Sequence, residues 1–463
     1  MKKLRHFNHL IFLTSVSLLI SCVETGSKHS DNPPLSNSFS EIAKRPPMGW
    51  NSYDCFGGNV TEQEVKANAD YMAEKLKQYG WEYVVVDFLW YCDDQDSWEK
   101  FANRRPAQHI DAYGRLIPSE KLYPSSAEGK GFKPLTNYIH SKGLKFGIHI
   151  MRGIPRQAIE QNTPIKNSTA KAAAIANLPD TCVWYGGLTG VNMTKKGAQE
   201  YYNSLFELYA SWGVDYIKVD DIVDQYHADE IEAIHKAILN CGRPIVLSLS
   251  PGPAFIGNPK HLRDNANLWR ISGDFWDKWS SLKRQLELCR DWAPLVTEGH
   301  WPDADMLPLG KLNIRTVSKN RKPHLTNFTK DEQYFLMTLW SIFRSPLMFG
   351  GNMPENDEFT LSLITNKEVI RVNQNSKNNK EIFFVNGVSI WTADDKEDSV
   401  KYMAILNIND TPQTVVLPLE VAGIKGNPTV KDLWTKTYLT KKDKGFEITL
   451  ATHGVSLLSF KAN

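Results

Sequence analysis

Residues 198–221 read AQEYYNSLFELYASWGVDYIKVDD, a predicted helix that leads straight into a predicted strand. The helix stops at Gly213, a residue that commonly ends helices because it tolerates a left-handed backbone. The short apolar run 216–219 predicts a strand, and two carboxylates, Asp220 and Asp221, follow it. A helix that returns directly to a strand is typical of the βα units of a parallel sheet.

The same unit recurs on both sides of this stretch. The first helix begins with a capping box at Thr61 and Glu64, and Gly80 ends it before an apolar strand. The sequence predicts parallel strands at 48–50, 83–86, 146–150, 216–219, 245–249, 268–271, 295–296 and 346–350. Eight βα units over this length favour a closed (β/α)8 barrel of the TIM type over an open sheet.

After about residue 377 the pattern changes to short strands without helices between them. These strands are split by turns rich in Asn, Asp and Gly, and they lie at 381–385, 388–391, 402–406, 414–417, 446–450 and 455–458. Such spacing predicts a small antiparallel β-sandwich. The expected fold class is therefore α/β, with a (β/α)8 barrel over 45–375 and a C-terminal β-sandwich over 376–463.

The first residues predict export. Basic side chains precede the apolar run 10–20, which is too short to span a bilayer as a mature helix. The small residue before Cys22 resembles a bacterial lipobox, in which the cysteine is lipidated, and the alternative is an ordinary signal peptide with an incidental cysteine. We expect a lipoprotein signal peptide over 1–22, a flexible tether over 23–44, and an exported chain held by its lipid on the periplasmic or cell-surface side of a bacterial membrane.

Composition narrows the range of partners. The 463 residues carry a net charge of +2 with the positive charges scattered, which argues against nucleic acid. Exposed Trp rings suit the apolar C–H faces of sugars, and the chain has fourteen Trp, although most Trp residues are simply core. Five cysteines follow Cys22, an odd number that leaves at least one unpaired, and none has the spacing of a structural zinc site.

Polar side chains gather at the predicted carboxyl ends of the barrel strands, where chemistry takes place in a closed βα barrel. They are Trp50, Asp87, His149, Asp220, Ser250, Arg270, Asp274, Asp303 and Asp305. Any single Asp could simply cap a helix. The whole collection is harder to explain in that way, and it predicts a polar site on this rim.

Two of these carboxyl groups fit the hydrolysis of a glycosidic bond, which needs one ionised and one protonated carboxyl. Lys218 and Asp220 lie two residues apart on one strand and face the same way, so the ammonium group would lower the pKa of Asp220, as suits a nucleophile. Asp274 precedes Phe275 and Trp276, and an apolar setting would favour the protonated form that an acid/base needs. Metal hydrolysis is less favoured, because no two histidines share a strand.

Four segments resemble glycoside hydrolase family 27, the melibiase-type α-galactosidases and α-N-acetylgalactosaminidases. They are RPPMGWNS at 45–52, YIKVD at 216–220, WRISGD at 269–274 and GHWPDADML at 299–307, in the order of the family. The resemblance covers about residues 45–375, and the C-terminal strands fit the same architecture. It implies a retaining exo-glycosidase that removes terminal α-D-galactosyl residues from an oligo- or polysaccharide without a cofactor or metal.

The resemblance also implies residue roles. Asp220 would be the nucleophile, and Asp274, four residues after an Arg, would be the acid/base. The expected sugar-binding residues are Trp50, Asp87, His149, Lys218, Ser250, Arg270 and Asp305.

The chain departs from the family after the second strand. Family α-galactosidases usually carry two adjacent Asp there, which hold the axial 4-OH and the 6-OH of the sugar. Here Asp87 is followed by Phe88, so one carboxylate is missing unless Asp93 or Asp94 folds back to replace it. His149 stands where the family often has Tyr.

Two further departures bear on substrate. Ser250 is small and would leave room beside a 2-substituent, and an insertion over 153–197 is expected to wall one side of the pocket. The alternatives to an α-D-galactoside are therefore an α-N-acetylgalactosaminide, or a β-L-arabinopyranoside, which lacks the 6-CH2OH. A glycan-binding surface lipoprotein without catalysis is the alternative from another class.

Overall fold

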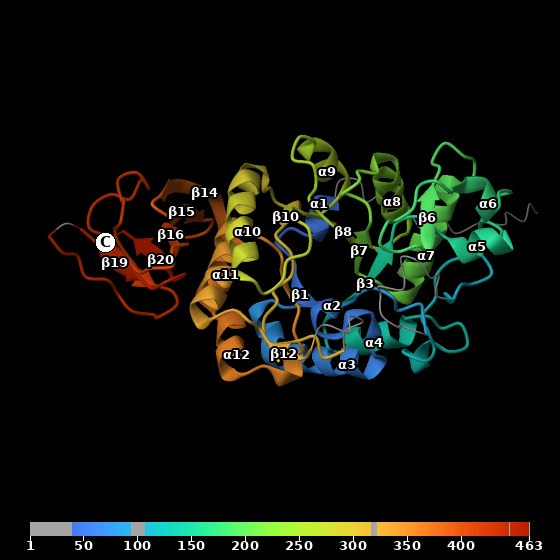
Figure 1. The fold of residues 1–463 in the computed structure, drawn as a ribbon, viewed down its shortest axis with the longest axis horizontal. Helices are drawn as coiled ribbons and strands as arrows, with labels where there is room; N and C mark the ends of the chain where they lie inside the picture. Colours follow the sequence, from blue (N-terminus) through green and yellow to red (C-terminus); the bar gives the residue numbers. More distant parts are fainter. Residues whose placement is uncertain (1–38, 94–106, 316–321, 444, 463) are drawn as a thin grey trace, which may run out of the picture. The chain divides into compact units, whose positions relative to one another are not determined.

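The computed structural model describes residues 39–93, 107–315, 322–443 and 445–462 (Figure 1). The predicted signal peptide, the predicted lipidation site Cys22 and most of the predicted tether lie outside these ranges, as does Asp94. Within them, no helix is long and apolar enough to cross a bilayer.

The core of the fold is an eight-stranded parallel sheet. Its strands are β1 (Met48–Asn51), β2 (Tyr83–Val86), β3 (Lys145–Met151), β7 (Tyr216–Asp220), β8 (Val246–Leu249), β9 (Leu268–Arg270), β10 (Trp301–Asp303) and β13 (Leu347–Phe349), in the order β10-β9-β8-β7-β3-β2-β1-β13. The sheet closes just after β10, where Leu307 donates its N–H to the carbonyl of Met348 at 2.7 Å and accepts the N–H of Gly350 at 2.9 Å. The predicted (β/α)8 barrel is confirmed.

Helices surround these strands (Figure 1). They are α1 (Phe39–Ile42), α2 (Tyr53–Phe56), α3 (Glu62–Tyr71), α4 (Lys133–Ser141), α7 (Ala198–Trp212), α8 (Ala228–Asn240), α9 (Pro259–Asn265), α10 (Trp279–Trp292), α11 (Lys330–Phe343), α12 (Glu358–Ile364) and α13 (Lys367–Asn375). The sequence signals act as expected: Thr61 and Glu64 form the capping box of α3, and Gly213 ends α7 with a φ of 88°.

Two smaller pieces decorate the barrel. The predicted insertion forms α5 (Arg156–Gln161), α6 (Ala172–Ile175) and a sheet of β4 (Ile154–Pro155), β6 (Leu188–Val191) and β5 (Ala176–Asn177). A hairpin of β11 (Lys311–Leu312) and β12 (His324–Leu325) precedes α11.

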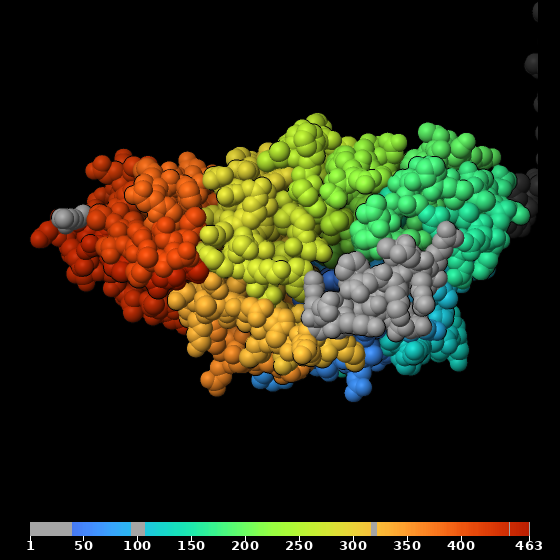
Figure 2. Space-filling view, in the orientation of Figure 1, coloured from blue at the N-terminus to red at the C-terminus, as the bar shows by residue number. Residues whose placement is uncertain are grey.

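The C-terminal region is antiparallel, as predicted. One sheet orders β14 (Ser376–Val385), β15 (Val388–Asp395), β16 (Val400–Asn407), β20 (Val455–Lys461) and β18 (Thr429–Asp432), and the other pairs β17 (Gln413–Val416) with β19 (Glu447–Leu450). Figure 2 shows this region against the surface of α10 and α11. There the His453 ring stacks on Trp279 with centroids 3.8 Å apart, and Trp434 Nε1 donates to Thr338 Oγ1 at 2.9 Å. The strand β18 was not predicted.

Two expected boundaries are wrong. The seventh barrel strand is Trp301–Asp303, whereas the predicted strand at 295–296 follows the 3-10 turn Ala293–Leu295. The error arose because a short Leu-Val run resembles a strand, while the real strand is only three residues long and contains a proline. The predicted tether also ends too late, because Phe39 in α1 is 5% exposed and packs against the ring of His235.

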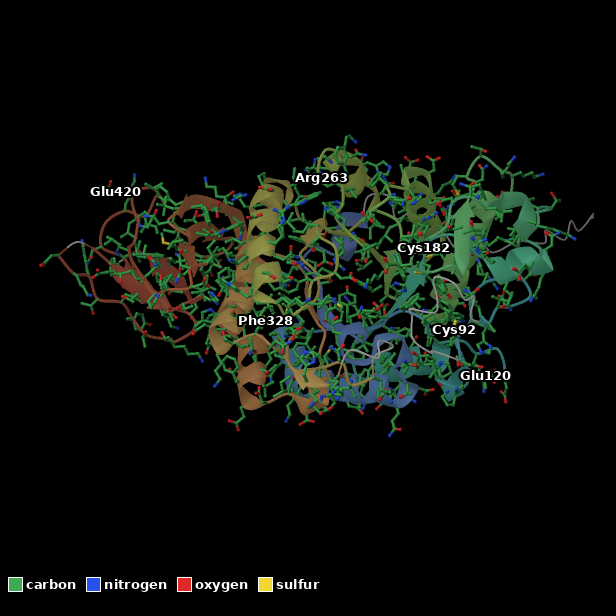
Figure 3. The ribbon with its side chains drawn as sticks, viewed as in Figure 1. Cys92, Glu120, Cys182, Arg263, Phe328 and Glu420 are labelled. Carbon is green, nitrogen blue, oxygen red and sulfur yellow. The ribbon has the colours of Figure 1, made fainter. Side chains whose placement is uncertain are left out.

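None of the five cysteines in the described ranges forms a disulfide; Figure 3 labels Cys92 and Cys182, both buried. Burial raises the pKa of the Cys92 thiol to about 12. The four buried cysteines therefore act as small core residues, and Cys241 is half-buried.

Candidate active site

A cavity of about 380 Å³ opens at the carboxyl ends of the barrel strands. Asp87, Asp220 and Arg270 reach it from the ends of β2, β7 and β9, and Asp305 reaches it from just beyond β10. Asp274 also lines it, so both proposed catalytic carboxyl groups share one cavity. This is the rim on which barrel enzymes place their chemistry.

Asp220 ends β7 with a side chain that is 13% exposed. Its Oδ2 lies 3.0 Å from Nε2 of His149, and its Oδ1 accepts the N–H of Asp221 at 2.9 Å. Burial alone would raise the pKa of Asp220, but the hydrogen bond and charge of His149, with the charge of Lys218, outweigh it and hold the pKa below its usual value. Asp220 is thus a carboxylate oriented from two sides.

Lys218 has a closer partner than Asp220. Its Nζ lies 3.0 Å from Oδ2 of Asp87, which also accepts from Asn51 Nδ2 at 2.7 Å. Burial works against the charge on Asp87, yet the Lys218 ammonium, together with His149 and the hydrogen bonds from Phe88 and Asn51, outweighs it and keeps the pKa of Asp87 well below its usual range. Lys218 therefore stabilises Asp87 first, and His149 is the main group that stabilises the carboxylate of Asp220.

Asp274 stands at the mouth of the cavity. Its side chain is 64% exposed, so the expected apolar enclosure by the residues after it is wrong. Arg270 Nη2 lies 3.4 Å from Asp274 Oδ1 and 2.6 Å from Asp305 Oδ2. The guanidinium of Arg270 thus connects the exposed carboxyl of Asp274 to the buried carboxyl of Asp305. The apolar surroundings that favour a protonated Asp274 would have to come from a bound molecule.

Three predicted site residues lie behind the cavity lining. Trp50 is fully buried and donates its Nε1 hydrogen to the carbonyl of Gly351 at 2.8 Å. His149 is fully buried behind Asp220, and Ser250 is 1% exposed, while its neighbours Pro251 and Gly252 line the cavity. Strand alternation places a residue on a face, but it does not tell how deep that residue sits in the barrel.

Several lining residues were missed by the sequence reasoning. They are Tyr53, Asp54, Gly57, Trp184, Asp224, Met306 and Asn313. Asp54 stands four residues after Trp50, close enough to a predicted strand end to have been considered. Trp184 belongs to the insertion. Its place in the cavity lining supports the expectation that the insertion forms one wall of the pocket.

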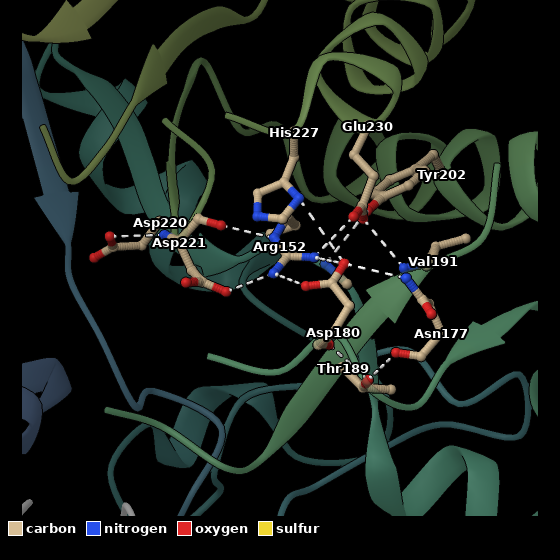
Figure 4. A network of polar contacts seen from close by, with 11 residues as sticks. Arg152, Asn177, Asp180, Thr189, Val191, Tyr202, Asp220, Asp221, His227 and Glu230 are labelled. Atoms are coloured by element: carbon tan, nitrogen blue, oxygen red, sulfur yellow. Dashed lines mark hydrogen bonds and ion pairs between the residues drawn. The ribbon is translucent and has the colours of Figure 1, made fainter. Parts of the chain in front are cut away.

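Behind Asp220, Arg152 holds a network of buried and half-buried charges (Figure 4). Its Nε donates to the carbonyl of Asp221 at 2.7 Å, and its guanidinium pairs at 2.9 Å with the carboxylates of Asp180, Asp221 and Glu230. Asp221 has a positive φ of 59°, a conformation that non-glycine residues adopt mainly when neighbours impose it. The network therefore fixes the turn after the strand that carries Asp220.

The same network contains a set of possible metal ligands. Ligand atoms of Asp180, His227 and Glu230 all lie within 4.8 Å of one another. Arg152 already pairs with both carboxylates, so its guanidinium supplies the positive charge that a cation would bring. We assign no metal to this cluster.

Two segments of the chain match models of α-galactosidase domains. Residues 185–375 match the family described as alpha galactosidase A, and residues 385–460 match the alpha galactosidase C-terminal beta sandwich domain. A protein named alpha-galactosidase A from Cellvibrio japonicus is 29% identical, over 79% of this chain and 74% of its own length.

Two solved structures are more similar in sequence than this relative. A β-L-arabinopyranosidase of glycoside hydrolase family 27 from Geobacillus stearothermophilus, determined with arabinose, is 48% identical with a TM-score of 0.88, over 92% of this chain and 99% of that one. A putative α-N-acetylgalactosaminidase from Bacillus halodurans is 45% identical with a TM-score of 0.82, over 90% and 97% of the two chains.

Proposed function

We propose that this chain, which belongs to glycoside hydrolase family 27 and is therefore a glycoside hydrolase, acts on terminal β-L-arabinopyranosyl residues. It would be a retaining exo-glycosidase. In this proposal Asp220 attacks the anomeric carbon while Asp274 protonates the departing oxygen. Asp274 then takes a proton from water, which attacks the covalent glycosyl–enzyme and releases the sugar with its anomeric configuration retained. The lowered pKa of Asp220 supports its role as the ionised member of the pair.

The observation that carries the choice of sugar is Phe88. This ring lines the cavity beside Asp87, is 6% exposed, and packs edge-on against Trp184 and Tyr185 at centroid distances of 5.5 and 5.0 Å. A phenyl ring cannot accept a hydrogen bond from a sugar 6-OH, and a hydroxymethyl group forced against it would lose its water without compensation. A β-L-arabinopyranoside has galactose geometry without that group.

Asp93 does not restore the missing carboxylate. It accepts a hydrogen bond from Ser119 Oγ and pairs with His109 Nε2 at 2.8 Å, and it is not among the residues that line the cavity. The similarity to the Geobacillus β-L-arabinopyranosidase agrees with the same choice. The α-N-acetylgalactosaminide alternative depended on space at Ser250, which is buried outside the lining.

The test is the kcat/KM of the purified protein on the nitrophenyl β-L-arabinopyranoside, α-D-galactoside, α-N-acetylgalactosaminide and α-glucoside. We expect the arabinopyranoside to be the best substrate, and Phe88→Asp to shift preference towards the galactoside, because it restores an acceptor for the 6-OH. Phe88→Leu is the matched control, since it makes space without an acceptor. A wild-type preference for the galactoside would refute the choice of sugar, and no turnover of any glycoside would favour the glycan-binding alternative.

We propose, from residues 1–22 alone, that the chain is exported and attached to a bacterial membrane through a lipid on Cys22. The test is fractionation of cells that express the wild type or Cys22→Ala with an intact apolar run. The wild type should appear in the membrane fraction and incorporate labelled palmitate, and Cys22→Ala should do neither. Equal behaviour of the two would refute the proposal.

A further inference from the structure

Asp54 is a lining residue to which the mechanism gives no task. It lies in α2, directly after β1, and it is 2% exposed while contributing to the wall of the cavity that contains Asp220 and Asp274. Its Oδ2 has no hydrogen-bond partner among the residues described by the structure. Buried carboxyl oxygens normally have partners, so an unmatched one on a residue that lines a binding cavity needs an explanation.

The surroundings of Asp54 leave little room for a negative charge. Its Oδ2 packs against the Cα of Gly350 so closely that a Cβ on that residue would be 2.1 Å away. The charged groups that act on it are the carboxyls of Asp305, Asp274 and Asp87 and the ammonium of Lys218. Burial first, and then the neighbouring carboxylates, raise the pKa of Asp54 well above its usual value, and Lys218 offsets this only in part.

We propose that Asp54 is a further substrate-binding residue, which as a neutral carboxylic acid donates a hydrogen bond to a hydroxyl oxygen of the sugar in the cavity. The proposal rests on the proposed glycosidase function, but not on which of the related sugars is the substrate.

The chemistry of the cavity explains why a neutral acid is useful there. An ionised carboxylate only accepts hydrogen bonds, whereas a protonated carboxyl has one donor and one acceptor oxygen. Asp87 and Asp305 already offer ionised or charge-paired acceptors, and a further negative charge beside them would repel both. If Asp54 lost its proton, it would no longer be a hydrogen-bond donor, and its negative charge would be repelled by those of Asp87 and Asp305.

The experiment compares Asp54→Asn with Asp54→Ala. The amide of Asn keeps the shape of the neutral acid and a donor hydrogen, but it does not titrate. We would measure KM and kcat against pH on the best aryl glycoside, and binding of the product sugar by calorimetry at each pH. Asp229→Asn, an exposed carboxyl in the first turn of α8, controls for a general effect of an acid-to-amide change.

In the wild type, binding should weaken as the pH rises through the pKa of Asp54, because the protonated form is the one that binds. Asp54→Asn should keep KM within about threefold and lose this alkaline weakening, while Asp54→Ala should raise KM about tenfold, as expected for one lost hydrogen bond. In both variants kcat should change less than KM. Asp229→Asn should behave as the wild type.

Two results would overturn the proposal. One is an Asp54→Asn protein, folded by circular dichroism, that binds as poorly as Asp54→Ala, because this would mean that the charge or the carboxylate itself is needed. The other is product binding by the wild type that does not weaken at high pH, which needs no variant. A different best sugar would refute the proposed substrate and leave the Asp54 test intact, since the same measurements would be made with that sugar.

Discussion

Replacing His149 with Phe should move the acidic limb of the pH profile to higher pH. In the structure Nε2 of His149 lies 3.0 Å from Oδ2 of Asp220, and the ring is fully buried. A carboxylate can only accept, so Nε2 carries the proton and donates. Nδ1 has no partner within the described residues, so the bond to Asp220 is the polar interaction that holds the ring.

The size of the effect follows from that bond. A hydrogen bond to a charged group contributes about 1.5 to 3 kcal/mol, so its loss should destabilise the ionised form of Asp220 by about that amount and raise the pKa of the carboxyl. The sign is fixed, because the bond favours the ionised form and Asp220 must be ionised to attack. Activity should therefore be lost at a higher pH in the variant, while the plateau above neutral pH changes less.

The assay is kcat/KM against pH, which reports the ionisation of the free enzyme. His149→Gln is the matched control, because its amide can place a donor nitrogen near the position of Nε2, and we expect its acidic limb to lie close to that of the wild type. The reasoning is refuted if His149→Phe, folded as judged by near-UV circular dichroism, shows the acidic limb of the wild type.

Three further outcomes are expected. Asp274→Ala should keep the first step on dinitrophenyl glycosides, which need no acid, and lose it on alkyl glycosides; equal losses in single-turnover assays would count against the acid role. Arg152→Met should destabilise the fold by about 3 to 5 kcal/mol in denaturant titrations, because it leaves the buried carboxylate of Glu230 and two half-buried carboxylates without their cation, and a change below about 1 kcal/mol would show that the network is not needed. Dithiothreitol should leave the thermal midpoint unchanged, since the described cysteines form no disulfide; a clear fall would contradict the structure.

The barrel was predictable because its signals are local. Alternating helices and strands, with Gly213 as a stop and the capping box at Thr61, repeat along the chain and need no knowledge of distant contacts. The prediction of the seventh strand was wrong because the contacts that define this strand come from residues far away in the sequence. Trp301 is held by its indole, which donates to the carbonyl of Ala43 at 2.7 Å, and residue 43 lies far away in the sequence.

The site shows the same division. Strand ends identified Asp220 and Arg270 as cavity residues, because a carboxyl-terminal position is a property of the segment alone. The depth of Trp50 and the pairing of Lys218 with Asp87 depend on where two strands meet, and a single strand carries no record of that. Lys218 and Asp220 were correctly placed on one face, yet proximity along a strand did not decide which carboxylate the ammonium would stabilise.

The pairing across the cavity has a consequence for catalysis. His149 contacts Asp220, Lys218 contacts Asp87, and Arg270 contacts Asp305, so each of these carboxylates has its own donor. Each carboxylate therefore has a donor or a positive charge beside it, which reduces the repulsion among the three negative charges in this poorly solvated part of the cavity. Asp274, largely exposed at the mouth, shares Arg270 with Asp305, whereas Asp220 has a donor of its own in His149, so the proposed acid/base and the proposed nucleophile of the two-step displacement have different polar partners.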